Sequence, residues 1–399
     1  MLKTIRRAEY AELIILFFLH GATLGIWLVP LSTVLDAHGL AAIKPFVFAT
    51  FSVAAFVSPL IFGAMADRHA SPVKVLRGLA LGTAVATGLA STGIKLGWNP
   101  WLVLALIQLL ALGASPTVSI TATIVFARLA NAQKEFGPVR AMATLGWICG
   151  CGLVSLLRAD ASTLAGYLGA AMWLLVAGYT YFLPAVDPPK SVQQLKWYER
   201  LGLDALALLK SPDHRGVFVT VALFSIPLAA FYPYAPPHLR ELGLQRTSAW
   251  MSLGQMTEIM AMFALGALLV RWRLKWLFAC GLSCGVLRYG FSALDTQAWL
   301  LAGVALHGVS FTFVVITAQI YLNERVDAAW RARAQALMSL MSSGVGSLIG
   351  YLGCGAWFSF CTPDSFTRWP LFWGGLALTV AAVLTFFLAA YHGRGQKPH

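Results

Sequence analysis

A single carboxylate lies near the middle of a long apolar run. The stretch SLGQMTEIMAMFALG, residues 252–266, contains Glu258 and, three residues earlier, Gln255. Residues three apart share one face of a helix. A charge at membrane depth costs several kcal/mol unless it is paired or hydrated, which makes Glu258 a candidate functional residue. It could bind a polar solute or take up a proton, because low-dielectric surroundings favour the neutral carboxyl group. Alternatively, it could form a structural ion pair with an arginine of another helix.

Two other apolar runs carry polar and aromatic residues at helical spacing. Arg140, Thr144 and Trp147 follow the pattern i, i+4, i+7 and therefore share one face. In a later run His307 and Phe311 are four residues apart, and Thr312 follows directly. Together with Gln255 and Glu258, these groups suit a polar solute that contains a flat ring. Aromatic side chains would stack on the ring, and the amide, carboxylate and guanidinium groups would bind its hydroxyls or edges.

Structural interpretations of the same residues remain open. Arg140 could be an anchor that extends its charge to the membrane surface. Arg288 lies late in its apolar run, which favours a structural role. His307 could be a buried histidine with no ligand, and Trp147 and Phe311 could pack against lipid or other helices.

Composition places these residues in a membrane protein. Of the 399 residues, 58% are hydrophobic and 11% are charged, whereas an average soluble domain is about one quarter charged. Apolar runs of roughly 20 residues recur along the chain, and each is long enough to cross a bilayer as a helix. We therefore expect an all-α polytopic membrane protein embedded in a lipid bilayer.

The sequence contains no paired carboxylates, metal-ligand cluster, nucleophile elbow or phosphate loop. We therefore expect no enzyme, no metal site and no organic cofactor. The formal charge of +13 is spread over short loops, so it does not indicate a nucleic-acid-binding patch.

The apolar runs predict twelve membrane spans. A polar connection, 185–213, separates six spans from six, so we expect a six-helix bundle over 1–184, a linker loop over 185–213 and a second bundle over 214–399. The expected spans are 13–35, 44–65, 73–94, 99–124, 137–157, 162–184, 214–234, 246–270, 274–293, 297–321, 331–357 and 368–391.

The distribution of basic residues predicts the orientation. Of the 29 lysines and arginines, 21 fall on the side that holds both termini and the 185–213 segment. Cytoplasmic loops carry the excess of positive charge in membrane proteins. Both termini are therefore expected to be cytoplasmic, in agreement with an even number of spans.

The layout of six spans, a long loop and six spans resembles the major facilitator superfamily. GAMADR, residues 63–68, is similar to the signature Gly-x-x-x-Asp-Arg between the second and third spans of that superfamily. We interpret Asp67 and Arg68 as a cytoplasmic gating latch, in which Asp67 caps a helix and Arg68 pairs with a neighbouring helix end. An ordinary charged turn is the alternative.

Several stretches resemble the nucleoside:proton symporter family within that superfamily. They are KWYERLGLDALALLKSP in the central segment, VRAMATLGW, SLGQMTEI, GVLRYGFSA and RARAQALMSLMSSGVG, and together they span most of the chain. The resemblance implies that Arg140, Thr144 and Trp147 form one substrate-binding motif. It implies a second motif in Gln255 and Glu258, and a third contact from Phe311.

The sequence departs from that family in its tenth span. His307 stands where the family has a tyrosine, and Thr312 stands where it has an aspartate, which is a natural proton site. Ala229 and Tyr232 stand roughly where the seventh span of the family has polar residues. Proton coupling would then depend on Glu258, aided by His307, or be lost.

The resemblance implies import of nucleosides by proton symport through alternating access. We expect a monomer in a bacterial inner membrane, with a nucleoside substrate that contacts Arg140, Thr144, Trp147, Gln255, Glu258, His307, Phe311 and Thr312. Two alternatives remain: a transporter of the same fold for a sugar, glycoside or aromatic acid, and a nucleoside facilitator that needs no protons.

Overall fold

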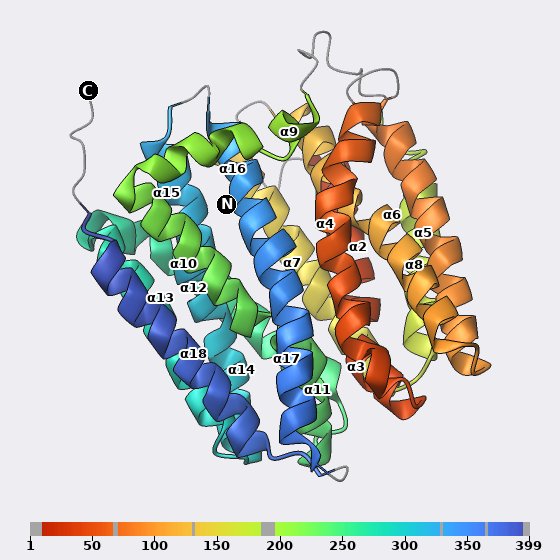
Figure 1. Ribbon diagram of the computed structural model, residues 1–399. Helices are drawn as coiled ribbons and strands as arrows, with labels where there is room; N and C mark the ends of the chain where they lie inside the picture. The colour runs from red at the N-terminus through yellow and green to blue at the C-terminus, as the bar shows by residue number, and fades with distance from the viewer. Residues whose placement is uncertain are drawn as a thin grey trace. The chain divides into compact units, whose positions relative to one another are not determined.

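The chain folds into helices that group into two units. The computed structural model describes residues 10–66, 71–129, 132–184, 196–327, 330–363 and 366–393, and no β-strand occurs among them. Unit 1 consists of Met1–Gln194, Tyr232–Arg240 and Leu244–Ser252, and unit 2 consists of Leu195–Phe231, Glu241–Gly243 and Leu253–His399. Figure 1 shows the helices of each unit.

Unit 1 is built mainly from seven helices, six of them long and one short. The first predicted span is two helices, because Pro30 lacks the N–H that would continue the helical hydrogen bonds. The helices are α2 (Ala11–Leu28), α3 (Leu31–Ala37), α4 (Lys44–Ala66), α5 (Pro72–Lys95), α6 (Pro100–Phe126), α7 (Ala132–Leu156) and α8 (Leu164–Tyr179).

The second half of the chain is divided more finely. Short helices α9 (Trp197–Arg200) and η3 (Leu203–Lys210) occupy the described part of the 185–213 segment, which we had expected to be a loop. The remaining elements are α10 (Pro212–Leu228), α11 (Phe231–Glu241), α12 (Thr247–Arg271), α13 (Leu274–Ser292), α14 (Gln297–Phe311), η4 (Thr312–Ile316), α15 (Thr317–Arg325), α16 (Arg331–Ser339), η5 (Leu340–Gly346), α17 (Ser347–Cys361) and α18 (Trp369–Ala390). Both η4 and η5 are π-helical.

Helical segments match all twelve predicted spans. Within the described residues, ten are long and apolar enough to cross a membrane. The other two predicted spans correspond to the shorter apolar helix Leu164–Tyr179 and to the 19-residue helix Leu274–Ser292. The predicted span 214–234 is interrupted at Ala229–Ala230, after which the helix resumes as α11.

Glycines allow the helices within each unit to approach closely. In unit 1, a Cβ atom at Gly146 or Gly150 would overlap the backbone of α2 at Phe18 or Ala22. In unit 2, Gly346 and Gly350 lie against backbone carbonyls of α10. Small residues four apart are typical of close contacts between membrane helices, and both glycine pairs have this spacing.

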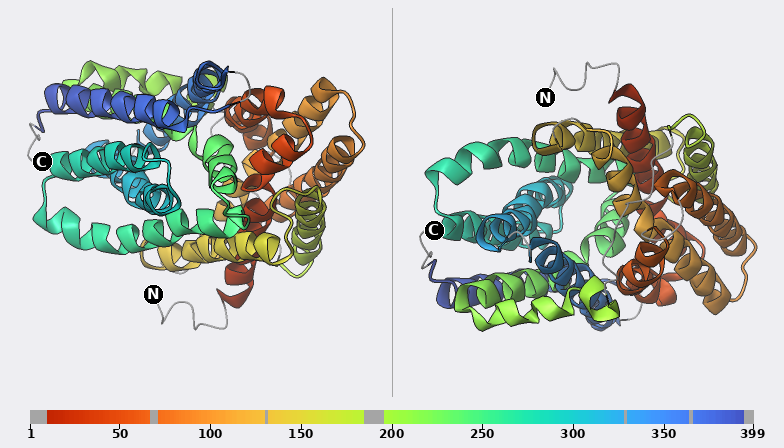
Figure 2. Two further views of the ribbon diagram at one scale, coloured as in Figure 1. Left: turned by 90° about the horizontal axis from the view of Figure 1, so that it is seen from below. Right: turned by 90° about the horizontal axis from the view of Figure 1, so that it is seen from above.

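Helix α13 is a central element of unit 2. It packs along α14 on one side and α18 on the other. Helix α18 also packs along α10, and the end-on views of Figure 2 show these two helices side by side. This arrangement positions Arg288 of α13 next to His307 of α14. The predicted latch residues Asp67 and Arg68 lie outside the described residues.

Candidate substrate-binding site

Helices α12 and α14 cross in close contact within unit 2. A Cβ atom at Gly308 would overlap the backbone nitrogen of Glu258 and the carbonyl oxygen of Gly254. Thr257 Oγ1 donates a hydrogen bond to the carbonyl of Ala305 across the same crossing. Two glycines and one hydroxyl therefore hold the two predicted binding helices together at the level of Glu258.

The crossing brings four predicted site residues into one region. Gln255 is buried on α12, and Glu258 is half-buried one turn later. A Cβ atom at Gly254, next to Gln255, would lie 3.2 Å from Cδ2 of His307. The His307 and Phe311 rings are 6.0 Å apart and nearly parallel. The backbone positions that carry an amide, a carboxylate, an imidazole and an aromatic ring therefore lie at one helix crossing.

A buried arginine organises the surroundings of His307. Arg288 Nη1 lies 2.8 Å from His307 Nδ1. The Phe231 ring stacks on the imidazole with centroids 3.8 Å apart and an angle of 12°. The Arg288 guanidinium also lies over the rings of Phe231, at 4.6 Å, and of Tyr289, at 4.5 Å. Cation–π contacts of this kind stabilise a desolvated guanidinium.

The hydrogen bond between Arg288 and His307 fixes the state of the imidazole. A guanidinium has only donors, so Nδ1 must be the acceptor. The ring is therefore neutral in this arrangement, and its proton is on Nε2. A second proton on Nδ1 would face the arginine N–H and break the contact.

Thr312 lies where the regular helix ends. It is fully buried and begins the π-helical segment η4, in which Thr317 Oγ1 donates to the Thr312 carbonyl at 3.2 Å. The Thr312 hydroxyl has no hydrogen-bond partner in the part of the chain that the structure describes. Single π-helical turns occur often at functional sites, and this one begins at the position where the sequence departs from the acid of the family.

The remaining three predicted residues lie on α7 in unit 1. Arg140 is exposed, and Thr144 and Trp147 are half-buried. The Trp147 ring lies 6.1 Å from the ring of Tyr232, at 49°. Its indole nitrogen is enclosed but has no hydrogen-bond partner within the described ranges. This motif therefore offers a cation, a hydroxyl and an N–H donor along one helix.

Some contacts of this arrangement have no clear signal in the sequence. Phe231 was missed as a partner of His307, although FYPYAPP marks the break at which α11 begins. The position of Arg288 near a span end favours a structural role, and in the structure it is buried and bonded to a predicted site residue. Ser292 and Gly303 help to explain its burial, because a Cβ atom at Gly303 would overlap both Ser292 and the Arg288 carbonyl.

Comparisons with known proteins agree with these observations. The family model described as Nucleoside H+ symporter matches residues 8–394. The putative nucleoside transporter YegT of Escherichia coli (strain K12) is 34% identical over 356 residues, which cover 86% of this chain and 82% of that protein. The xanthosine permease of the same organism is 25% identical, with 96% and 97% of the two chains covered.

Solved structures share the fold. A crystal structure of the nucleoside transporter NupG matches with a TM-score of 0.86 and 24% identity, covering 96% of this chain and 99% of that one. The POT family transporter PepTSo matches with a TM-score of 0.72 and 13% identity, with 98% and 99% covered. The expected major facilitator fold is confirmed. The family match and the relatives show that the protein is a multi-pass membrane transporter rather than an enzyme. The chain belongs to the nucleoside H+ symporter family.

Proposed function

We propose that this protein imports nucleosides by proton symport. The observation that carries the proposal is the α12–α14 crossing in a chain of this family. It packs the backbone of Glu258 against Gly308, and Gly254, the neighbour of Gln255, against His307. An amide and a carboxylate suit the hydroxyls of a ribose, and Phe311 suits a flat base. Arg140, Thr144 and Trp147 of α7 are the proposed second substrate-binding motif, and Thr312 would border the first.

Glu258 is the proposed proton carrier. His307 is the other candidate by sequence, but its Nδ1 accepts a hydrogen bond from Arg288 and its ring is neutral. Protonation of Glu258 would remove a charge from the membrane interior, which lowers the cost of changing access. A neutral Glu258 can still donate one hydrogen bond to a substrate oxygen.

Transport would follow the alternating-access scheme of this fold. We propose that two six-helix halves, 1–184 and 214–399, rock about a central site near the bilayer midplane, with 185–213 as their linker. Asp67 and Arg68 would form the cytoplasmic latch. The proposed setting is a bacterial inner membrane, with both termini cytoplasmic and the protein acting as a monomer.

Uptake into proteoliposomes tests the proposal. Labelled uridine and adenosine would be measured with and without an inward proton gradient, for the wild type, Glu258→Gln and the exposed control Glu324→Gln. We expect the gradient to raise uptake in the wild type and the control, and to have no effect in Glu258→Gln. Uptake that ignores the gradient in the wild type would indicate a facilitator.

A second candidate function is transport of another polar solute. The hydroxyl of Thr312 replaces a carboxylate that the family resemblance implies, and this changes what the site can recognise. If the wild type takes up neither nucleoside, sugars, glycosides and small aromatic acids are the next substrates to measure, and nucleoside symport is contradicted.

A further inference from the structure

Helix α12 begins in unit 1 and continues in unit 2. Residues Leu244–Ser252 belong to unit 1, and the chain from Leu253 onward belongs to unit 2. Gln255 and Glu258 therefore follow within two turns of the point where the helix leaves unit 1. The contacts of its first turn show what holds it there.

The first turn of α12 is capped by residues distant in the sequence. Ser248 N donates to Asp160 Oδ1 at 2.7 Å, and Ala249 N donates to Ser155 Oγ at 2.9 Å. These are the second and third residues of the helix, whose N–H groups have no partner within a helix. The residue before the helix, Arg246, cannot cap these N–H groups with its side chain, because a guanidinium has only donors. The helix therefore takes its cap from the end of α7 and the turn after it.

The capping groups are held together as one cluster. Ser155 Oγ donates to Asp160 Oδ1 at 2.9 Å, and the Thr247 hydroxyl lies 3.5 Å from the same oxygen. Asp160 is 5% exposed and Ser155 is 2% exposed. The negative carboxylate also faces the positive end of the α12 dipole. Burial and charge therefore both favour the intact cap.

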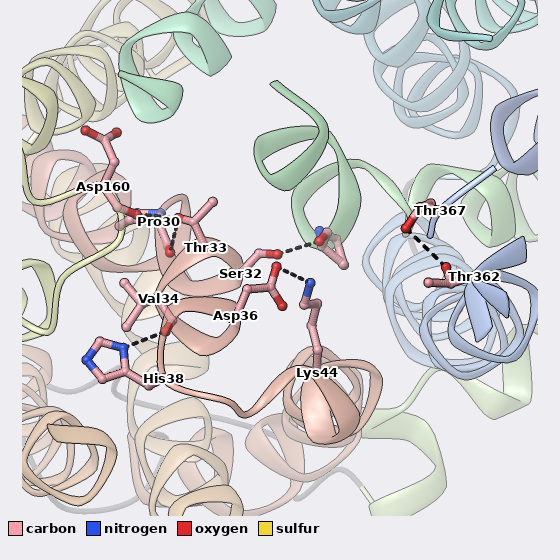
Figure 3. Close-up of polar contacts among 11 residues, drawn as sticks. Pro30, Ser32, Thr33, Val34, Asp36, His38, Lys44, Asp160, Thr362 and Thr367 are labelled. Carbon is pink, nitrogen blue, oxygen red and sulfur yellow. Dashed lines mark hydrogen bonds and ion pairs between the residues drawn. The ribbon is translucent and has the colours of Figure 1, made fainter. Parts of the chain in front are cut away.

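The turn that presents Asp160 is itself anchored. Arg158 adopts a left-handed backbone with φ 54°, which lets Ala159 N bond back to the Val154 carbonyl at 2.9 Å. Thr33 Oγ1 of α3 donates to the Asp160 backbone carbonyl (Figure 3). The neighbouring Ser32 hydroxyl donates to the carbonyl of Pro233 in α11, also drawn in Figure 3.

The cap joins the two helices that carry the predicted binding motifs. Ser155 follows Trp147 by eight residues on α7, and Ser248 precedes Gln255 by seven residues on α12. At 1.5 Å per residue, these separations are about 12 Å and about 10 Å. The cap thus lies at a similar distance along each helix from its binding motif. It is at the end of both helices that the charge distribution predicts to be extracytoplasmic.

We propose that Asp160 is a positioning residue for transport. With Ser155, it holds the start of α12 against the end of α7 and keeps the outer end of the substrate path closed. Opening that end requires Ser248 N and Ala249 N to exchange these acceptors for water, which can replace them once the first turn is solvated. The inference rests on the proposed transport function, but its primary test needs no substrate.

Two native cysteines report on the cap. Cys151, one turn before Ser155, is fully buried in unit 1, and Cys361 is fully buried in unit 2. Each would be kept as the single cysteine in right-side-out vesicles and treated with a membrane-impermeant thiol reagent. In Asp160→Ala we expect Cys151 to react about tenfold faster than in the wild type, because charge-assisted capping bonds are lost. The rate at Cys361 is expected to stay unchanged.

Two further variants separate a cap from a general structural role. Asp160→Asn keeps one side-chain acceptor, so the Cys151 rate is expected to lie between those of Asp160→Ala and the wild type. Ser155→Ala should raise the Cys151 rate in the same direction. Equal Cys151 rates in wild type and Asp160→Ala would overturn the proposal, as would a matching increase at Cys361, which indicates unfolding.

Uptake kinetics give a readout that altered stability alone would not change. If opening is favoured in Asp160→Ala, the KM for external nucleoside falls while the maximal rate also falls, because the return to the closed state is slower. A fall in maximal rate with unchanged KM, at constant protein in the membrane, would contradict the positioning role. Absence of nucleoside uptake by the wild type would overturn the proposed substrate and leave the cysteine result interpretable.

Discussion

Arg288 Nη1 lies 2.8 Å from Nδ1 of His307, and both side chains are buried within unit 2. The pair joins α13 to α14, and Phe231 covers both the guanidinium and the imidazole. Because the arginine always donates, the pair keeps the histidine neutral. The exchange of a tyrosine for a histidine, which the family resemblance implies at this position, therefore does not add a charged group to the site.

This relationship predicts different results for two replacements of His307. Asn offers Oδ1 in roughly the place of Nδ1, whereas Leu offers no acceptor to Arg288. We expect His307→Leu to lower the free energy of unfolding by about 1–3 kcal/mol, since a buried charged donor loses this bond, and His307→Asn to lower it less. Thermal unfolding in detergent measures the difference.

The same variants test which group carries the proton. If Glu258 is the carrier, His307→Asn keeps the stimulation of uptake by an inward proton gradient, although its KM for nucleoside changes. Loss of that stimulation in His307→Asn, with Glu258 intact, would assign the proton to the histidine instead.

The α12–α14 crossing predicts a strong effect of one methyl group. In Gly308→Ala, the new Cβ atom overlaps backbone atoms of Gly254 and Glu258, which cannot rotate away. We expect a loss of about 1–3 kcal/mol of stability from overpacking, together with a lower uptake rate because Glu258 shifts. Unfolding in detergent and proteoliposome uptake measure the two effects.

Gly266→Ala is the matched control on α12. A Cβ atom at Gly266 meets no atom within 4 Å, and alanine favours a helix over glycine by up to about 1 kcal/mol. Stability is therefore expected to stay equal or rise. Equal stability and equal uptake rates of Gly308→Ala and Gly266→Ala would show that α12 and α14 are not in close contact at Gly308.

The indole N–H of Trp147 provides a test of the second binding motif, on α7. Its indole N–H has no protein partner in the described residues, so a substrate oxygen is a suitable acceptor. We expect Trp147→Phe, which keeps an aromatic ring, to raise the KM for nucleoside roughly 2- to 10-fold, the value of one ordinary hydrogen bond. Trp101→Phe, at a residue that is 61% exposed, serves as the control. An equal KM in both variants would show that the indole N–H of Trp147 does not bind the substrate.

Much of the fold follows from local patterns in the sequence. Apolar runs of membrane length predict the helices, and small residues four apart, such as Gly346 and Gly350, predict close contacts. The three-residue spacing of Gln255 and Glu258 predicts a shared face. These features depend only on helical periodicity, which is why they could be identified without coordinates.

Other parts of the site depend on contacts between distant segments. Ser248 and Asp160 are 88 residues apart, and neither lies in a periodic pattern that indicates the other. Phe231 stacks on His307 at the point where α10 has ended, at Leu228, and α11 begins. The π-helical turn at Thr312 likewise depends on backbone geometry that residue type does not specify.

The central segment, one of the stretches that resemble the family, packs against α16 in the structure. This contact leads to a prediction for two glycine variants. In LGLDALALLK, Gly202 has φ 70°, and a Cβ atom there would overlap the Arg333 carbonyl on α16. Asp204 Oδ2, two residues later, pairs with Arg333 Nη1 at 2.7 Å. Gly39 has a similar φ of 72°, but a Cβ atom there meets nothing within 4 Å. The two glycines therefore share a backbone requirement and differ in packing.

We expect Gly39→Ala to lower stability by about 1–2 kcal/mol, the cost of a left-handed backbone for an L-residue. Gly202→Ala is expected to cost clearly more, because the methyl group also separates η3 from α16 and weakens the Asp204–Arg333 pair. Thermal unfolding of both variants in the same detergent gives the comparison, with Asp204→Asn as a measure of the ion pair alone. That pair is partly exposed, so its loss should cost at most about 1 kcal/mol. Equal destabilisation by Gly202→Ala and Gly39→Ala would mean that the segment is conformationally required but does not pack against α16 as the structure indicates.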